Sequence, residues 1–384
     1  MEMNKVKLGE ICDKIGSGAT PRGGKNSYLG GNVSLIRSMN VFDTGFVVDG
    51  LAKINDEQAD ALKNVIVKKN DVLINITGAS VARCCNAPDY ILPARVNQHV
   101  SIIRPRENLC NPIYLRNYLI QQNIKDKLLS SSIGSSREAI TKDFLEKFEI
   151  EIPDIQTQTS IAKVLSSLDD KIELNNKINK ELENLAKTIY EYWFVQNADR
   201  NWEKGKLSEI ANITMGQSPN GSSYNENGNG IIFYQGCTDF GARFPTIRQY
   251  TTAPTRFAEI GDILLSVRAP VGSLNFANTK CCIGRGLAAL NSKLGSITHL
   301  YFILKDLEML FKHRNTDGTT FGAITKDDLF SLPITKPPKD ILMQFEKLAN
   351  PIFDKQFEIA EESASLAQLR DFLLPLLMNG QVKV

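Results

Sequence analysis

The stretches AITKDFLEKFEIEIP (Ala139–Pro153) and AITKDDLFSLPITKP (Ala323–Pro337) share their first five residues and begin 184 positions apart. Each leads through a proline into a long segment that is rich in lysine and glutamate. Self-similarity of this kind indicates a repeated architecture and is followed before any other pattern. The chain therefore builds the same junction twice, and the segments on either side of the junction decide the fold.

The repeat extends to the N-terminal side of both junctions. KVKLGEI at Lys5 matches KGKLSEI at Lys204, and DVLINITGA at Asp71 matches DILLSVRAP at Asp262. The offset falls from 199 to 191 and reaches 184 at the junction, so the segments before the junction differ in length. We predict two fronts followed by two helical arms, in the order front 1–152, arm 153–198, front 199–336 and arm 337–384.

Both arms show the alternating four- and three-residue spacing that is typical of a coiled coil. The seam of the first arm is Ile161, Leu165, Leu168, Ile172, Asn175, Asn179, Leu182, Ala186, Ile189 and Trp193. The seam of the second is Phe345, Ala349, Ile352, Gln356, Ile359, Ser363, Leu366, Arg370, Leu373 and Leu377. Each seam turns polar in its middle, which lowers stability but specifies register. These matched positions favour arms that pack on each other. The alternative is two amphipathic helices that each lie on their own front.

One residue interrupts this pattern. Pro351 lies within the second arm, and proline inside a helix removes a backbone donor and crowds the preceding turn. We expect Pro351 to kink the arm or to open its main section with Asn350 as the cap.

The fronts have mixed character, and we predict an α+β fold for each. Strand-like composition occurs at Val33–Val41, Asp71–Ile76, Val100–Arg104, Gly230–Tyr234, Asp262–Val267 and Ala288–Leu290. Helical stretches occur at Pro112–Leu129 and Thr298–Phe311. Loops rich in glycine and asparagine connect them, and such loops can approach a ligand closely.

Composition excludes several classes of protein. The seven cysteines form no CxxC pair, and the three histidines have unrelated spacing, so we expect free thiols and no bound metal. No apolar run approaches the roughly 18 residues of a membrane helix, and the polar start does not resemble a signal peptide. We therefore expect a cytoplasmic protein without a membrane partner. The arms at Ile155–Phe194 and Lys339–Leu374 carry −1 and −3 of the total charge of +2, which leaves +6 elsewhere and suits contact with DNA.

Motifs of catalysis are missing or imperfect. NPIY at Asn111 and NPIF at Asn350 lack the second proline of the amino-methyltransferase motif NPPY/F, and Pro after Asn is ordinary at the start of a helix. GATPRGGKN at Gly18 has the wrong spacing for a phosphate-binding loop. The sequence also contains no ExK of a metal-dependent nuclease. We do not expect this chain to be an enzyme.

Three stretches resemble a known family. QTQTSIAKVLSSLDDKIELNNKINKELENLAKTIYEYWF, from Gln156 to Phe194, is similar to the central conserved region of specificity subunits of type I restriction–modification systems. DILLSVRAPVGSLNFANTKCCIGRGLAAL, from Asp262, and VNQHVSIIRP, from Val96, resemble two classes of their target-recognition domains. The order front, arm, front, arm extends the resemblance over nearly the whole chain.

The resemblance implies a DNA-reading subunit with two target-recognition domains on an antiparallel coiled coil. Each domain would read one half of a bipartite double-stranded DNA site, and the arms would set the spacing between the halves. Two methyltransferase subunits would dock and methylate adenine, and restriction subunits would cleave. S-adenosylmethionine, ATP and Mg would then belong to these partners, and this chain would bind no cofactor. An alternative is a coiled-coil scaffold whose two domains bind protein or carbohydrate.

Direct reading of bases uses the forked donors of arginine and the amides of asparagine and glutamine. In the first front the candidates are Arg37, Arg83, Arg95, Asn97, Gln98 and Arg137, and in the second Gln217, Gln235, Arg243, Arg268 and Arg285. Ser17, Thr20, Lys25 and Ser218 in the loops suit phosphate contacts. Any of these residues can instead be structural. The aromatic cluster Tyr190, Tyr192, Trp193 and Phe194 is a candidate anchor for a methyltransferase subunit, and its alternative role is packing of the arm onto the second front.

Overall fold

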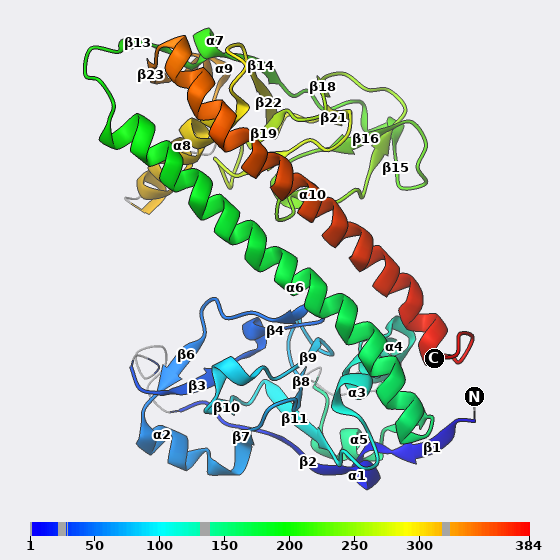
Figure 1. Ribbon diagram of the computed structural model, residues 1–384. Helices are drawn as coiled ribbons and strands as arrows, with labels where there is room; N and C mark the ends of the chain where they lie inside the picture. The colour runs from blue at the N-terminus through cyan, green and yellow to red at the C-terminus, as the bar shows by residue number, and fades with distance from the viewer. Residues whose placement is uncertain (1, 22–27, 29, 131–138, 317–322) are drawn as a thin grey trace. The chain divides into compact units, whose positions relative to one another are not determined.

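The structure is a computed structural model that describes residues 2–21, 28, 30–130, 139–316 and 323–384 (Figure 1). Two of the predicted site residues, Lys25 and Arg137, lie outside the described residues. The chain divides into two compact units, and each unit includes one front and parts of both arms. Unit 1 comprises Met1–Lys171 and Leu366–Val384, and unit 2 comprises Ile172–Ser365.

Within its described residues, unit 1 contains two four-stranded sheets and two shorter strand pairings at their margins. The first sheet is antiparallel and has the order β2 (Cys12–Ser17), β11 (Val100–Pro105), β8 (Val72–Asn75) and β9 (Cys84–Asn86). The second has the order β6 (Ala52–Ile54), β3 (Val33–Ile36), β10 (Ala94–Val96) and β7 (Ile66–Val67), with β3 and β10 parallel. Beside them lie the β4 (Val41–Phe42) and β5 (Gly45–Phe46) hairpin and the helices α2 (Asp56–Ala61), α3 (Pro112–Leu119) and α4 (Gln122–Ser130).

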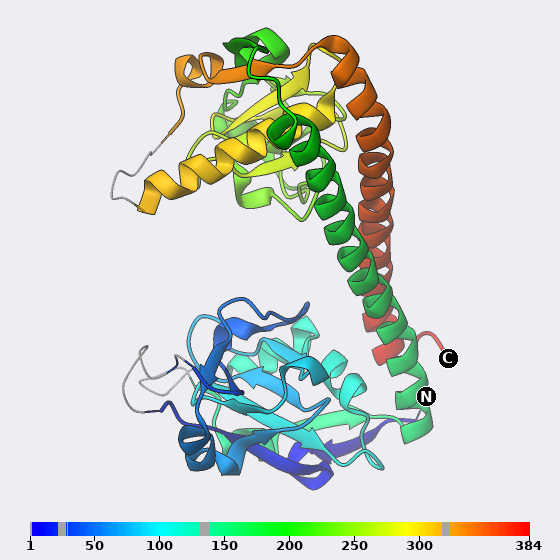
Figure 2. The same ribbon diagram turned by 60° about the vertical axis from the view of Figure 1, so that its left-hand side comes forward.

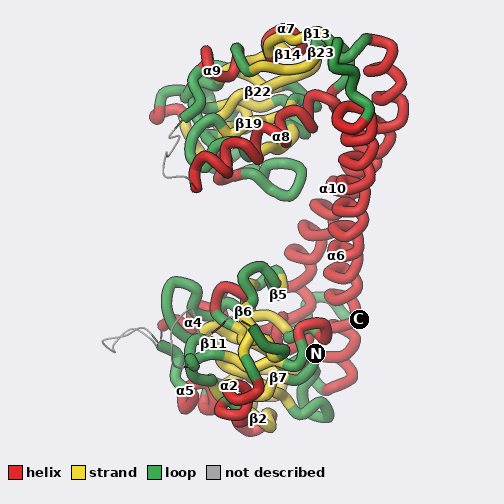
Figure 3. The backbone as a smooth tube through the Cα atoms, turned by 90° about the vertical axis from the view of Figure 1, so that its left-hand side faces the viewer, coloured by secondary structure: helices red, strands yellow, loops and turns green. Residues whose placement is uncertain are grey.

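Unit 2 repeats this topology with different loop lengths. Its first sheet has the order β14 (Ala211–Met215), β22 (Leu287–Ser292), β19 (Ile263–Ser266) and β20 (Leu274–Phe276). Its second has the order β15 (Tyr224–Asn225), β17 (Tyr250–Thr251), β16 (Ile231–Tyr234), β21 (Cys281–Ile283) and β18 (Phe257–Ala258), with β16 and β21 parallel. Figure 3 shows these strands with α8 (Ile297–Thr316) lying along β19 and β22. The internal repeat and the α+β class predicted from the sequence are confirmed.

The central strand of each first sheet separates two hydrophobic cores. Successive side chains of a strand point to opposite faces. Val72 and Ile74 of β8 therefore pack in one core of unit 1, whereas Leu73 packs in the other. Ile263 and Leu264 of β19 are divided in the same way in unit 2. Burial on both faces explains why these strands read as continuous apolar runs in the sequence.

The repeated junction attaches each front to its arm through the same contacts. The backbone N–H of Ile140 donates to the carbonyl oxygen of Ile76 at 2.9 Å, and Ile324 donates to Val267 at 2.8 Å. The next residue, Thr141 or Thr325, caps a short helix, α5 (Lys142–Lys147) or α9 (Lys326–Phe330). A strand then returns to the start of the front, where β12 (Glu149–Ile152) pairs with β1 (Asn4–Lys7), and β23 (Pro333–Lys336) pairs with β13 (Glu203–Lys206). The helical turns α1 (Leu8–Ile11) and α7 (Leu207–Ile210) follow β1 and β13.

The arms form the long helices α6 (Ile155–Glu191) and α10 (Lys339–Met378), which lie side by side in each unit (Figures 1 and 2). In unit 1, Asp169 of α6 accepts from Arg370 of α10 at 2.9 Å. In unit 2, Asn175 donates to Glu362 at 2.8 Å, and Gln356 donates to the carbonyl oxygen of Asn179 at 3.0 Å. The partner number falls as the number along α6 rises, so the helices are antiparallel. Every residue of the two predicted seams is buried or half-buried.

The arms also pack on the fronts. Both alternatives therefore apply, since each arm packs on the other arm and on the fronts. Ile161 and Leu165 of α6 belong to the core of the first front, and Ala186 belongs to the core of the second. Within the described residues, none of the helices is both long and apolar enough to span a membrane. All seven cysteines are free, and five of them are buried.

The prediction that Pro351 opens the main section of the second arm is wrong. Helix α10 continues through Pro351, and Asn350 donates its side-chain amide to Asp354 at 2.9 Å instead of capping a helix start. Phe345, Ala349 and Phe353 on either side of the proline are buried in the core of unit 2. This packing holds the helix although one backbone hydrogen bond is lost. The other NP pair behaves as expected, since Asn111 caps α3 by accepting from Ile113 and Tyr114.

Candidate nucleic-acid interface

Four loops of unit 1 meet at one edge of its two sheets. The chain leaves β2, β3, β8 and β10 at this edge, which we call reading edge 1 and define as Ser17–Thr20, Arg37–Asn40, Ile76–Arg83 and Asn97–His99. Backbone hydrogen bonds connect the loops, since Gly18 donates to Asn97 at 3.1 Å, Asn97 to Ile36 at 3.0 Å, and Ile76 to His99 at 2.9 Å. The buried amide of Asn75 adds a bond to the carbonyl oxygen of Ser38 at 3.0 Å. The sequence therefore assembles distant loop residues into one surface.

A cleft of about 960 Å³ lies at reading edge 1. Its lining includes two of the predicted DNA-contacting residues, Arg83 and Gln98. The remaining lining residues are Ser38, Thr77, Gly78, Ala79, Ser80, His99 and Ala139. Sequence reasoning missed the polar members of this set, although Thr77 could have been found from its alignment with Arg268 in the repeat.

A chain of hydrogen bonds orients Gln98 at the cleft. The hydroxyl of Thr20 donates to the side-chain oxygen of Gln98, and the side-chain nitrogen of Gln98 lies 3.2 Å from Nε2 of His99. An amide nitrogen can only donate, so Nε2 of His99 accepts and its Nδ1–H donates to the Thr77 hydroxyl at 2.5 Å. Each end of the Gln98 amide is thus held by one neighbour and keeps one donor or acceptor free.

Other predicted residues of unit 1 also lie at this edge. Ser17 is exposed at the end of β2. Arg83 is half-buried, with its guanidinium 4.9 Å from the ring centre of Phe42. Arg37 is half-buried and donates to the carbonyl oxygen of Gly50. The structure brings these residues together with Thr20 and Gln98.

Unit 2 has the equivalent surface, reading edge 2, formed by Gln217–Pro219, Gln235–Cys237, Val267–Gly272 and Gly284–Gly286. The loops are again connected through backbone groups, with Gln217 donating to Ile283 at 3.0 Å, Gly284 to Tyr234 at 2.8 Å, and Val267 to Gly286 at 2.9 Å. All but one of the predicted residues of the second front lie here, namely Gln217, Ser218, Gln235, Arg268 and Arg285.

Two exposed arginines dominate reading edge 2. Arg268 lies in a turn fixed by buried Ser266, whose hydroxyl donates to the carbonyl oxygens of Arg268 at 2.8 Å and Pro270 at 2.7 Å. Arg285 lies between Gly284 and Gly286, and a Cβ atom at Gly286 would approach the carbonyl oxygen of Gln235 to 2.6 Å. Within the described part of the chain, no hydrogen bond or ion pair engages either guanidinium group. Both side chains are exposed.

Ser218 connects two loops of this edge. Its hydroxyl accepts from the side-chain nitrogen of Gln235 at 2.9 Å and from the backbone N–H of Arg285 at 3.2 Å. Gln235 is therefore more restrained than the two arginines.

The prediction that Arg243 contacts a base is wrong. Its side chain is buried, and Nη1 donates to Glu183 of α6 at 2.9 Å. The guanidinium group lies 4.6–5.3 Å from the ring centres of Phe276, Tyr301, Phe353 and Phe357. Arg243 thus holds the second front onto its arm.

The predictions that Arg95 and Asn97 contact bases are also wrong, because both side chains are buried. Arg95 is buried in β10 and donates to the carbonyl oxygens of Ala59 at 3.1 Å and Ala94 at 3.0 Å. Burial lowers its pKa. The buried side chain of Asn97 accepts the backbone N–H of His99 at 3.0 Å and so shapes the loop that presents Gln98.

The aromatic cluster at the end of α6 is mainly part of the core. Tyr190 is buried, its ring centre lies 5.0 Å from that of Phe302, and its hydroxyl donates to Asp306 at 3.1 Å. Burial and the Asp306 carboxylate raise the pKa of Tyr190 well above its usual range. Trp193 and Phe194 pack against the same core. Tyr190 is therefore wrong as a partner anchor, whereas Tyr192 is 57% exposed.

Exposed apolar side chains continue from Tyr192 along α6. Leu174, Ile178 and Leu185 are 51%, 37% and 50% exposed. Spacings of four and seven residues place these side chains on one side of the helix, next to the seam. We call Leu174, Ile178, Leu185 and Tyr192 the α6 stripe.

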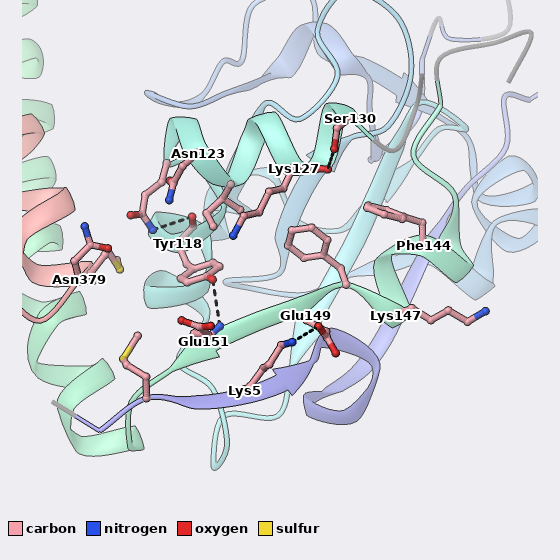
Figure 4. Close-up of a pocket in the computed structure, with 15 residues that line it drawn as sticks. Lys5, Tyr118, Asn123, Lys127, Ser130, Phe144, Lys147, Glu149, Glu151 and Asn379 are labelled. Atoms are coloured by element: carbon pink, nitrogen blue, oxygen red, sulfur yellow. Dashed lines mark hydrogen bonds and ion pairs between the residues drawn. The ribbon is translucent and has the colours of Figure 1, made fainter. Parts of the chain in front are cut away.

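A second pocket of unit 1 lies away from reading edge 1, between the paired strands β1 and β12 and the C-terminal end of α10 (Figure 4). It has a volume of about 630 Å³ and is lined by Lys5, Tyr118, Glu149 and other residues. Lys5 and Glu149 form an ion pair at 2.6 Å, and the Tyr118 hydroxyl accepts the backbone N–H of Glu151 at 3.1 Å. None of the predicted site residues lines this pocket. Its charged and polar groups bond to each other and hold β1, β12 and α3 together.

Unit 2 has the equivalent pocket, with larger side chains. Its pocket has a volume of about 240 Å³ and is lined by Phe194 and Trp202, which the repeat aligns with Met378 and Met3 of the first pocket. The described residues contain no group of three or more His, Cys, Asp or Glu side chains placed to hold a metal ion.

The two-unit architecture agrees with comparisons to known proteins. The model of the type I restriction modification DNA specificity domain matches residues 1–184 and again 199–361, so this chain belongs to that family. The chain is 27% identical over 406 residues to a Methanocaldococcus jannaschii protein assigned as the MjaX specificity subunit, covering 98% of this chain and 93% of that protein. It is 22% identical over 473 residues to the HindI specificity subunit of Haemophilus influenzae, covering 99% and 100%.

A solved structure shares the fold. The type I restriction–modification S subunit from M. genitalium superposes with a TM-score of 0.62 at 16% identity, covering 98% of this chain and 96% of that one. Together, the family and the fold identify DNA sequence recognition within a type I restriction–modification system as the function of this chain.

Proposed function

We propose that each unit reads one half of a bipartite DNA site through its reading edge. The observation that carries this proposal is the gathering of forked or amide side chains on equivalent loops of both units, Arg83 and Gln98 in one and Arg268 and Arg285 in the other. Such side chains match the donor and acceptor patterns of base edges in the major groove. The hydroxyls of Ser17, Thr20 and Ser218 beside them suit phosphate oxygens.

The two halves of the proposed site differ in sequence. Equivalent positions of the two reading edges carry different side chains, such as Thr77 and Arg268. Two identical readers would select a symmetric site, whereas unlike readers select an asymmetric one. The spacing between the halves is set by the length of the arms in this proposal.

The chemistry resides on partner subunits. We assign no catalytic group to this chain, and S-adenosylmethionine, ATP and Mg are expected on the methyltransferase and restriction subunits. Two methyltransferase subunits dock in this proposal, and one contact surface is the α6 stripe. Its four apolar side chains are exposed on a helix whose other sides are polar or packed. Exposed apolar groups of this extent indicate a protein interface. Action on cellular DNA agrees with a cytoplasmic location.

Selection from a duplex library tests the function. The chain is purified with its methyltransferase subunits and selects from random duplexes, and methylated adenines are mapped in DNA from cells that contain the complex. We expect one bipartite consensus from both measurements. Binding without base preference would contradict the proposal and favour the scaffold alternative, in which the fronts bind protein or carbohydrate.

A further inference from the structure

Gln98 and Arg285 occupy the same position in the two units. In unit 1, Val96 of β10 pairs with Ile36 of β3, and in unit 2, Ile283 of β21 pairs with Tyr234 of β16. Gln98 and Arg285 each follow the paired residue by two positions. The next strands begin two residues later in both units, at Val100 and Leu287. The strands before and after this loop therefore align Gln98 with Arg285 without a gap.

The backbone holds the two residues in the same way. The residue before each one donates its N–H to the end of the parallel strand, at 3.0 Å from Asn97 to Ile36 and at 2.8 Å from Gly284 to Tyr234. The carbonyl oxygen of the residue after each one accepts a backbone N–H at 2.9 Å, from Ile76 to His99 in unit 1 and from Val267 to Gly286 in unit 2. A hydroxyl residue of a third loop also reaches each position, Thr20 at Gln98 and Ser218 at Arg285.

The side chains at this shared position have different chemistry. Arg285 is exposed, and its fork of donors matches the O6 and N7 acceptors of guanine. Gln98 is also exposed, and its amide keeps one donor and one acceptor free beside Thr20 and His99. One donor and one acceptor match N7 and N6 of adenine.

From this equivalence we infer that Gln98 and Arg285 are the corresponding specificity-determining residues of the two units, Gln98 for adenine and Arg285 for guanine. The inference rests on the proposed function and goes beyond it by assigning one base in each half-site. Arg268 adds a second arginine at reading edge 2, at a position where unit 1 has Thr77.

Reciprocal substitutions test the inference with the complex of this chain and its methyltransferase subunits. In library selection, R285Q is expected to replace guanine by adenine at one position of one half-site and to leave the other half unchanged. Q98R is expected to replace adenine by guanine at one position of the opposite half-site. Each original base is favoured by about 5- to 100-fold in the unmodified complex. R285K keeps the charge without the planar fork, so it is expected to keep guanine at this position with a weaker preference.

Control variants lie outside the reading edges. Lys280 precedes β21, whereas Arg285 follows it, so K280Q removes a charge at the opposite end of the same strand. Q122R adds a charge on the exposed side of α4. Both controls are expected to leave the consensus unchanged. If R285Q and Q98R also leave it unchanged, the inference is overturned and the bipartite function stands. A wild-type complex that selects no site would overturn the proposed function itself.

Discussion

Buried Arg243 and half-buried Glu183 form an ion pair with 2.9 Å between guanidinium nitrogen and carboxylate oxygen, and four aromatic rings surround the arginine. Glu183 also accepts from the Tyr301 hydroxyl at 2.8 Å and from Gln356 of α10 at 3.3 Å. One carboxylate thereby connects the second front to both helices within unit 2.

Removing the arginine should strongly destabilise unit 2. R243A removes a buried guanidinium group from among four aromatic rings and leaves the partly exposed Glu183 without its cation, so we expect it to lower the free energy of unfolding by about 2–4 kcal/mol. Urea denaturation of the purified chain measures the change. K280A removes an exposed lysine whose partner Glu259 is also exposed, and it serves as control with an expected loss below about 1 kcal/mol. Equal losses in both variants would show that the Arg243 pair has no special role.

Burial of His299 should make unit 2 sensitive to acid. Burial lowers the pKa of this histidine to about 4, from 6.5 in the unfolded chain. The unfolded chain therefore binds a proton first, so stability is full above pH 6.5 and falls as the pH drops toward 4, by about 3 kcal/mol in all. Urea denaturation at several pH values should show this slope in the original protein.

The substitution H299F provides the matched comparison. The ring lies among Tyr190, Phe194 and Phe345, so phenylalanine suits its environment. We expect the variant to lose the part of the pH dependence that lies between pH 6.5 and 4. The same slope in both proteins would place the acid sensitivity elsewhere.

Replacing Asn175 by leucine should stabilise the paired helices. Asn175 is buried in the seam and donates to Glu362 at 2.8 Å and Ser363 at 3.2 Å. A polar seam residue favours register over stability, so N175L is expected to raise the free energy of unfolding by about 1 kcal/mol. Thermal unfolding monitors the change, with N176L at the exposed neighbouring position as control. A clear decrease for N175L would mean that the hydrogen bonds outweigh apolar packing here.

Charges on the α6 stripe should weaken assembly without unfolding the chain. Leu185 is half exposed, so L185E leaves the core unchanged but places a charge in the proposed methyltransferase interface. We expect at least a tenfold loss of affinity for the methyltransferase subunit, which corresponds to about 1.4 kcal/mol. Titration calorimetry or gel filtration measures it. K180E changes an exposed residue on another side of α6 and should bind normally. Unimpaired binding of L185E would remove the stripe from the interface.

Lengthening both arms should change the DNA spacing that the complex accepts. Insertion of one heptad preserves the seam and adds about 10 Å of helix. The selected spacer is expected to lengthen by about three base pairs, at 3.4 Å per pair. Insertion of the same number of residues into the loop around Gly228 of the second front provides a control. A spacer that stays constant would show that the arms do not set it.

The sequence predicted features that depend on local periodicity. Five of the six strand segments, the seam of α6 and α10, and the repeat follow from apolar spacing that is visible over short windows. The sixth segment, Val33–Val41, was predicted too long, because its strand ends at Ile36 and a 3-10 turn at Ser38–Asn40 follows. The repeat was informative because the strand registers of the two units place Ala139 beside Thr77 and Ala323 beside Arg268 in the same way.

The incorrect site residues depend on contacts between distant parts of the chain. Arg243 resembles a surface arginine until Glu183, 60 residues earlier, is placed beside it. The partners of Arg95 are backbone carbonyls, which no sequence pattern reveals. Thr77 carries no forked or amide side chain that marks a base contact in the sequence. Pro351 stays within a helix because core packing on both sides outweighs one lost hydrogen bond.

The hydrogen bonds from Ile140 to Ile76 and from Ile324 to Val267 join main-chain atoms. Such bonds are indifferent to the side chains of the strand that accepts them. Recombination between genes at this junction can therefore replace one front by another of different sequence while the helices α6 and α10 stay unchanged. New target sequences become accessible by shuffling as well as by point mutation.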